Sequence, residues 1–216
     1  MSEDLVVVVA GGVEPPHLKT MTFIPAGTPV VAADSGLERA RDWGFEVTIA
    51  VGDFDSASPD AVTAAEASGT RIERHPAEKN ATDLELALDA ALQLDPQRIV
   101  VLAVVGDRLD HLLSMLLLLA APRYAGVELD ADIGQAHAHV IHDERVLPGH
   151  SGELLSLFAL HGPARGVRTE GLAYPLAGET LDPGSTRGVS NVFVAESARI
   201  SVEHGVLVAV RPGVEP

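Results

Sequence analysis

Four unbroken runs of small or β-branched apolar residues mark the first half of the chain and constrain its fold more than any other feature. Each run stops at glycine or aspartate, and segments with helical patterning separate the runs. Strands without a polar face are buried on both sides, as in a parallel sheet covered by helices. The runs cover residues 5–10, 30–34, 47–53 and 99–106, with 70–75 as a short extra strand and 137–143 as a possible fifth.

Helix start signals lie between these runs. Residues 58–60 (Ser-Pro-Asp) have the order of an N-cap, a first-turn proline and a first-turn acid. Thr82 and Glu85 have capping-box spacing at the start of a second helix. Residues 108–122 are apolar nearly all round, so we expect a well-buried helix there.

The pattern changes after about residue 145. Short apolar runs follow one another, and glycine and proline turns separate them at the spacing of a small antiparallel β-sandwich. We therefore predict an α/β fold, with an N-terminal Rossmann-like parallel-sheet domain over residues 1–147. A C-terminal antiparallel β-sandwich over residues 148–216 follows it.

The composition excludes several classes of function. Asp and Glu number 31 against 15 Lys and Arg, a formal charge of −16, which disfavours a nucleic-acid partner. The chain has no cysteine, so disulfides, thiolate metal sites and cysteine nucleophiles are excluded. The acidic N-terminus does not resemble a signal peptide, and the most apolar stretch, 112–121, is about half a membrane span. We expect a soluble, cytoplasmic protein that does not enter a membrane.

Acidic residues gather where the predicted strands end. Asp34 follows one run, Asp53 and Asp55 follow another, and Asp83 opens a helix after the short extra strand. In an open α/β sheet, ligands bind at the carboxyl ends of the strands. Like charges about 4 Å apart repel by about 4 kcal/mol at an effective dielectric of 20, so a shared crevice needs a cation. Oxygen ligands favour Mg²⁺.

Basic residues adjoin the acids. Lys79 precedes Asp83, and Arg108 lies between Asp107 and Asp110. Acids that hold a metal, beside cations that hold phosphoryl oxygens, are typical of phosphoryl transfer. Any one of these acids alone could instead serve a turn or a helix N-terminus. The chain has no P-loop motif and no G-x-G-x-x-G after the first strand, so a P-loop enzyme and the usual dinucleotide fold are not expected.

Four ordered segments resemble the thiamine pyrophosphokinase family over nearly the whole chain. Residues 33–56 are similar to its A-D-G-G, G-x-x-P-D and G-D-x-D-S motifs, and residues 78–88 to its K-D-x-T-D-x-E motif. Residues 106–111 (GDRLDH) are similar to G-G-R-x-D-H. The segments GLAYPL and STRGVSN resemble the thiamine-side region of the bacterial members.

The resemblance implies an α/β nucleotide-binding catalytic domain followed by a β-sandwich for thiamine binding and dimerisation. Members are homodimers that hold thiamine between the sandwich of one subunit and the nucleotide domain of the other. They transfer a pyrophosphoryl group from ATP to the thiamine hydroxyl and release AMP, with Mg²⁺. ATP and thiamine are thus the expected partners, with no nucleic acid and no membrane.

The same resemblance implies roles for individual residues on the nucleotide side. Metal ligands would be Asp53, Asp55 and Asp83. The catalytic set would be Asp53, Asp55, Asp83, Arg108 and Asp110. The set that binds the nucleotide and its phosphates would be Asp34, Ser56, Lys79, Thr82 and His111.

On the thiamine side the resemblance implies contacts from Tyr174, Ser190 and Asn191. Tyr174 has an independent rationale, because a cationic thiazolium ring over an aromatic face gains about 0.5–2 kcal/mol. It could instead pack within the sandwich, and Ser190 and Asn191 could be turn residues.

Three departures from the family pattern stand out. Asn80 replaces an aspartate, Asp107 replaces a glycine, and Ser35 replaces another glycine. We hypothesise that Asp107 partly restores the charge lost at Asn80. Two alternative functions stay open. One is a D-x-D-type metal-dependent phosphohydrolase with Asp53 as nucleophile, and the other is a non-catalytic thiamine-binding relative.

Overall fold

The computed structural model describes residues 4–11, 24–103 and 108–213. The chain divides into two compact units. The first comprises Met1–Met115 with Ala131–Gly134, and the second comprises Leu116–Asp130 with Gln135–Pro216. The domain boundary between residues 147 and 148 stays a prediction.

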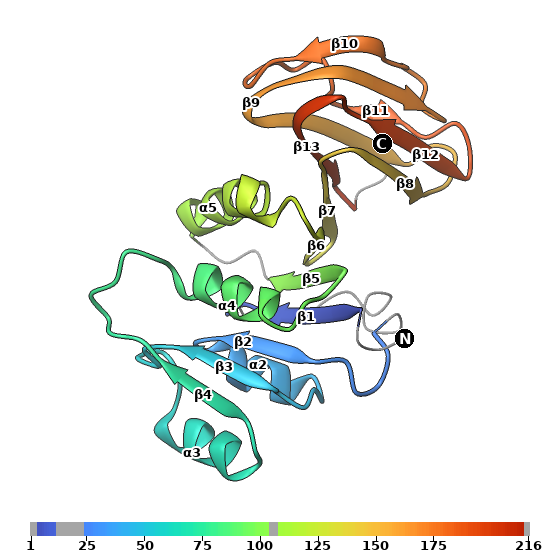
Figure 1. Ribbon diagram of the computed structural model, residues 1–216. Coiled ribbons are helices and arrows are strands. Elements are labelled where there is room, and N and C mark those ends of the chain that lie inside the picture. The colour runs from blue at the N-terminus through green and yellow to red at the C-terminus, as the bar shows by residue number, and fades with distance from the viewer. Residues whose placement is uncertain (1–3, 12–23, 104–107, 214–216) are drawn as a thin grey trace. The chain divides into compact units, whose positions relative to one another are not determined.

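A parallel sheet forms the framework of the first unit (Figure 1). Its strand order is β4-β3-β2-β1-β5. Strands β2, β3 and β4 follow one another outward on one side of β1, and β5 lies on the other side of β1, so the strand order reverses at β1. Such a reversal is where open α/β sheets bind ligands. The strands are β1 (Leu5–Val9), β2 (Val30–Ala33), β3 (Ile49–Gly52), β4 (Arg71–Arg74) and β5 (Arg98–Ala103).

The predicted runs therefore form strands, including the short extra one at β4. The last part of the predicted run 99–106 lies outside the described residues. Nearly every residue of β1, β2, β3 and β5 is buried, because helices cover the sheet.

Helices pack on this sheet as right-handed crossovers require. Residues of α2 and α3 share apolar clusters with one face of the strands. The connection from β4 to β5 runs the opposite way across the sheet, and its helix α4 contacts β1, β2 and β3 from the other side (Figure 1). The helices are α2 (Gly36–Asp42), α3 (Pro59–Ala67) and α4 (Asp83–Leu92).

The capping predictions are confirmed. The Ser58 hydroxyl accepts a hydrogen bond from the Ala61 amide at 3.2 Å, with a proline in the first turn. The Thr82 hydroxyl accepts one from the Glu85 amide at 3.2 Å. No helix in the described part of the chain is long and apolar enough to cross a membrane.

The expectation that residues 108–122 form a well-buried helix is wrong in part. The helix forms as α5 (Leu109–Leu119), and a short 3₁₀ turn, η1 (Pro122–Tyr124), follows it. However, Leu109 is 75% exposed and Leu113 is 56% exposed. A helix packed along one side buries only that side, so apolar residues all round do not make every face buried.

The second unit is an antiparallel β-sandwich, and a single long strand contributes to both of its sheets (Figure 1). The first half of β9 pairs with β13, and the second half pairs with β12 and β10. The strand turns the corner at His161 and Gly162, which both have positive φ. Its strands include β8 (Glu144–Pro148), β9 (Leu154–Glu170), β10 (Ala177–Leu181), β11 (Asn191–Val192), β12 (Ser197–Ser201) and β13 (His204–Arg211).

Residues 137–143 form a strand as predicted, but the expectation that this strand is parallel is wrong. They form β7 (Ala136–Ile141), which pairs antiparallel with β13. The preceding strand, β6 (Glu128–Ile133), ends two residues before β7 begins. A two-residue link cannot make a parallel crossover, which needs about a dozen residues.

Candidate active site

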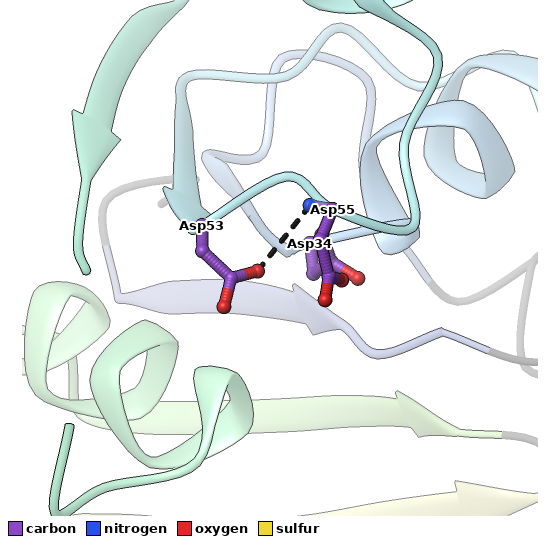
Figure 2. Close-up of side chains that lie close together, drawn as sticks. All are labelled: Asp34, Asp53 and Asp55. Atoms are coloured by element: carbon purple, nitrogen blue, oxygen red, sulfur yellow. Dashed lines mark hydrogen bonds between the residues drawn. The ribbon is translucent and has the colours of Figure 1, made fainter. Parts of the chain in front are cut away.

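Three carboxylates meet at the carboxyl ends of β2 and β3 (Figure 2). One oxygen from each of Asp34, Asp53 and Asp55 lies within 4.8 Å of the others. Asp34 directly follows β2, while Asp53 and Asp55 follow β3, the strand paired with it. The sheet edge thus brings together acids that are about twenty residues apart in sequence.

Backbone geometry at two positions produces this convergence. Asp34 has φ +47° and Phe54 has φ +59°, a region in which residues other than glycine are uncommon. The Asp34 amide donates to the Val51 carbonyl at 2.8 Å, which holds its turn against β3. The Asp55 amide donates to Oδ1 of Asp53 at 3.3 Å (Figure 2), so the turn around Phe54 keeps both carboxylates on one side.

Gly52 allows the acids to approach one another. Its φ is +156°, and a Cβ built on it would lie 3.2 Å from both Oδ1 of Asp83 and the backbone of Asp34. Any larger residue would therefore push against the cluster. From the sequence, the apolar run indicates only that a strand ends at Gly52. The signal for the role of Gly52 in the approach of the acids is that it comes directly before Asp53 and Asp55 in the sequence.

Lys79 joins Asp53 to Asp83. Its ammonium nitrogen lies 2.9 Å from Oδ2 of Asp53 and 3.0 Å from Oδ1 of Asp83. Burial alone would lower the pKa of Lys79, but hydrogen bonds to these two carboxylates outweigh it and raise the pKa. The same hydrogen bond from Lys79 lowers the pKa of Asp53. Both partners of this pair are therefore charged at neutral pH.

Asp34 has a carboxylate oxygen that needs a further partner. Burial raises its pKa, and the charges of Asp83 and Asp55 add to that effect while a hydrogen bond from the Ser35 backbone opposes it. Its Oδ1 is buried and has no hydrogen-bond partner among the residues described. A divalent cation among the three oxygens would relieve both features, so the donor set fits Mg²⁺.

Two further predicted residues lie beside the cluster. The Ser56 hydroxyl donates to Oδ1 of Asp55 at 2.8 Å. Thr82 caps α4 and so fixes Asp83 in the first turn of that helix. Asn80, the departure from the family pattern, is exposed in the loop that carries Lys79.

Three predicted residues at the start of α5 interact with each other. Arg108 donates through Nε and Nη2 to the two carboxylate oxygens of Asp110, at 2.9 and 2.7 Å. This bidentate pair lowers the pKa of Asp110 and raises that of Arg108. The amide of His111 donates to the Arg108 carbonyl. Within the described residues, no hydrogen bond or ion pair joins these three to the acidic cluster, and Asp107 lies outside those residues.

On the sandwich, Asn191 is only 5% exposed, whereas Tyr174 is 68% exposed. The Asn191 amide accepts from the Tyr174 N–H at 3.0 Å and donates to the Tyr174 carbonyl at 2.7 Å. The Ser190 amide donates to the Ser156 hydroxyl at 3.0 Å. Asn191 is thus committed to the backbone, and Tyr174 is the member of the predicted set whose side chain projects outward.

One supporting contact was not foreseen from the sequence. Phe54 lies between the two acids of the motif, is 8% exposed and packs into the cluster beneath α2 and α3. The guanidinium carbon of Arg74 sits 5.3 Å from the centre of its ring. The Phe54 ring therefore anchors the turn that presents Asp53 and Asp55.

Comparison with known proteins adds independent findings. The family model described as "Thiamin pyrophosphokinase, catalytic domain" matches residues 23–129, and "Thiamin pyrophosphokinase, vitamin B1 binding domain" matches residues 138–207. A protein named thiamine pyrophosphokinase from Bacillus subtilis (strain 168) is 28% identical over 211 residues, which is 94% of this chain and 96% of that protein.

Solved structures agree. The crystal structure of thiamine pyrophosphokinase from Bacillus subtilis has a TM-score of 0.82 at 25% identity, covering 96% of this chain and 98% of that one. A thiamin pyrophosphokinase family protein from Enterococcus faecalis has a TM-score of 0.80 at 28% identity, with coverages of 95% and 97%. The yeast thiamin pyrophosphokinase, 13% identical with a TM-score of 0.75, shares the fold over 96% of this chain and 86% of that one.

A parallel α/β sheet with acids at its carboxyl edge and a following β-sandwich, together with relatives named as pyrophosphokinases, defines this protein as a transferase. The chain belongs to the thiamine pyrophosphokinase family, whose catalytic and vitamin B1 binding domains match its sheet and its sandwich in order. The predictions of an enzyme and of the α/β plus β-sandwich fold are confirmed.

Proposed function

We propose that this enzyme transfers a pyrophosphoryl group from ATP to the hydroxyl of thiamine, giving thiamine diphosphate and AMP. The thiamine hydroxyl oxygen forms a bond to the β-phosphorus as the bond from that phosphorus to the α,β-bridging oxygen breaks. AMP leaves with the electron pair, and the hydroxyl proton passes to the solvent. Family membership supports this reaction, and the cluster of Asp34, Asp53 and Asp55 is the observation that carries it.

The sequence predicts Asp53, Asp55 and Asp83 as metal ligands, but the oxygens that lie within 4.8 Å of one another are those of Asp34, Asp53 and Asp55. We therefore propose Asp34 in place of Asp83 as the third residue that would hold Mg²⁺, which would neutralise charge on the triphosphate. Asp83 and Ser56 support this set, because Asp83 is tied through Lys79 to Asp53 and Ser56 hydrogen-bonds to Asp55. Lys79 and Arg108 are the cations that would face phosphate oxygens. Asp110 makes a bidentate ion pair with the Arg108 guanidinium, and His111 follows it in the same turn.

The thiamine side rests on Tyr174. Its exposed ring would lie against the cationic thiazolium, a contact worth about 0.5–2 kcal/mol. Asn191 would act as a positioning residue, since its amide is bonded to the Tyr174 backbone. Ser190 stays a predicted contact of thiamine.

The predicted homodimer is also a proposal. Analytical ultracentrifugation should give a mass near twice the 22.6 kDa of the chain. A monomer that is fully active would contradict an arrangement in which two subunits share each thiamine site. Cytoplasmic location and the absence of nucleic-acid and membrane partners remain predictions.

One assay separates the candidate functions. The protein is mixed with ATP, Mg²⁺ and thiamine, and the products are followed by ³¹P NMR. We expect AMP and thiamine diphosphate in equal amounts. Phosphate release that does not depend on thiamine would support the D-x-D phosphohydrolase instead, and thiamine binding without turnover would support a non-catalytic relative.

A variant ties the reaction to the cluster. Asp53→Asn keeps the shape of the side chain but removes its charge, and we expect the rate to fall by at least about 10²-fold. Asp60→Asn, in the first turn of α3, is the matched control and should change the rate little.

A further inference from the structure

The ammonium group of Lys79 lies between the carboxylates of Asp53, which belongs to the acidic cluster, and Asp83, which lies beside it. It lies 2.9 Å from Oδ2 of Asp53 and 3.0 Å from Oδ1 of Asp83, and its side chain is only 13% exposed. Asp53 is bonded on both sides, because its other oxygen accepts from the Asp55 amide. A cation is therefore built into the site.

The loop that carries Lys79 is fixed at both of its ends. At one end the His75 amide donates to the Gly52 carbonyl at 2.9 Å, directly beside the cluster. At the other end Thr82 caps α4. Lys79 itself is in neither a helix nor a strand. Its flexible four-carbon stem can move the ammonium without moving either anchor.

We propose that Lys79 is an internal counter-ion that competes with the divalent metal and is handed from the carboxylates to the substrate phosphates. This inference rests on the proposed function. A metal ion that takes an oxygen of Asp53 comes within a few ångströms of the ammonium, and the two cations repel each other. Metal entry with the nucleotide resolves the conflict, because the phosphates supply new acceptors for Lys79.

The arrangement has a consequence for binding order. Without the nucleotide, a metal ion must displace Lys79 with no replacement acceptor, so it binds weakly. With the nucleotide bound, the metal can take the carboxylate oxygens while Lys79 donates to the phosphate oxygens. The metal-nucleotide complex is therefore favoured over the metal alone, and Asp53 and Asp83 keep a cationic partner between turnovers.

Calorimetric titration of Mg²⁺ into nucleotide-free protein tests the competition. Lys79→Met should bind Mg²⁺ at least about tenfold more tightly than wild type, a difference of about 1.4 kcal/mol. The same variant should bind the Mg²⁺ complex of ATP more weakly. Lys79→Arg keeps the charge and should resemble wild type. Arg71→Met removes an exposed cation paired with Glu73 and controls for net charge.

Unchanged or weaker Mg²⁺ binding by Lys79→Met would overturn the proposal, since Lys79 would then not compete with the metal. These outcomes are separate from the proposed function, which product formation by the wild type decides. A protein that makes thiamine diphosphate can still fail this test.

The unmodified protein offers a second measurement if the methionine variant does not fold. The chain contains two lysines, Lys19 and Lys79, so acylation by a succinimidyl ester can be assigned by mass spectrometry. We expect Mg²⁺ to raise the acylation rate of Lys79 severalfold, with Lys19 as the internal reference. Saturating Mg²⁺ that leaves the rate at Lys79 unchanged would contradict its displacement.

Discussion

The side-chain amide of Asn191 holds the backbone of Tyr174 through two hydrogen bonds, one to the N–H at 3.0 Å and one to the carbonyl at 2.7 Å. Asn191→Asp replaces the donor with an oxygen that faces the Tyr174 carbonyl. We expect the free energy of unfolding to fall by about 1–3 kcal/mol. The KM for thiamine should rise and the KM for ATP should stay near its wild-type value.

Tyr174→Phe is the matched control, because it keeps the aromatic face. It should retain thiamine KM, whereas Tyr174→Leu should raise it. Equal effects of Asn191→Asp on both substrates would show that Asn191 acts on stability alone and not through the presentation of Tyr174.

Gly52→Ala tests the close approach at the end of β3. A methyl group there would lie 3.2 Å from Oδ1 of Asp83 and from the backbone of Asp34, at a φ of +156°. We expect about 1–3 kcal/mol of lost stability and weaker binding of the Mg²⁺ complex of ATP. Gly44→Ala, where a Cβ meets nothing within 4 Å but φ is also positive, controls for backbone strain. If both variants bind the nucleotide equally well, Gly52 has no role in bringing the acids together.

Phe54→Ala should remove the anchor of the acidic turn. The ring is 8% exposed, so truncation should lower the free energy of unfolding by about 3–5 kcal/mol. Arg74→Gln removes only the contact with the ring and should cost about 0.5–1 kcal/mol. Denaturant unfolding measures both values. A larger cost for Arg74→Gln than for Phe54→Ala would mean that the ring is not the anchor.

Glu153 gives a pH-dependent contribution to stability. Burial would raise its pKa, but hydrogen bonds from Arg211 and His150 outweigh burial and lower it. A lowered pKa stabilises the fold above the unfolded value of about 4.3, and that contribution is lost as the pH falls through the folded pKa. Glu153→Gln should therefore lose about 1 kcal/mol at pH 7, and its difference from wild type should shrink as the pH falls below about 4.3 and through the folded pKa.

Glu170→Gln is the control for this comparison. Glu170 is 78% exposed and lies 3.8 Å from Arg199, so its loss should change stability little at any pH. A difference between Glu153→Gln and wild type that is the same at pH 3 and pH 7 would rule out the charge of Glu153 as the cause.

Much of the fold could be predicted because its signals are local. The buried strands are continuous apolar runs, and the caps at Ser58 and Thr82 follow from residue type and spacing. Strand β7 could be found from its apolar pattern but its orientation could not, because that pattern is the same in a parallel and an antiparallel pair. The strand β6, which ends two residues before β7 and so rules out a parallel crossover, was not recognised from the sequence. The exposed face of α5 could not be predicted, because in a helix that is apolar nearly all round the sequence does not distinguish the buried face from the exposed one.

The acids of the site could be found from strand ends, but their geometry could not. Nothing in the sequence indicates that Phe54 adopts a positive φ, or that Lys79 lies between Asp53 and Asp83. These features depend on how β3, β4 and α4 meet. Sequence spacing gives the identity of such residues and leaves their contacts to the tertiary structure.

The most direct test of the account is a crystal structure with Mn²⁺ and α,β-methylene-ATP. In this analogue a methylene group replaces the α,β-bridging oxygen, so the bond that the proposed reaction breaks cannot be cleaved. We predict an anomalous metal peak in contact with Asp34, Asp53 and Asp55, with the Lys79 ammonium moved onto phosphate oxygens. A metal bound elsewhere, with these three carboxylates directed away from the nucleotide, would contradict it.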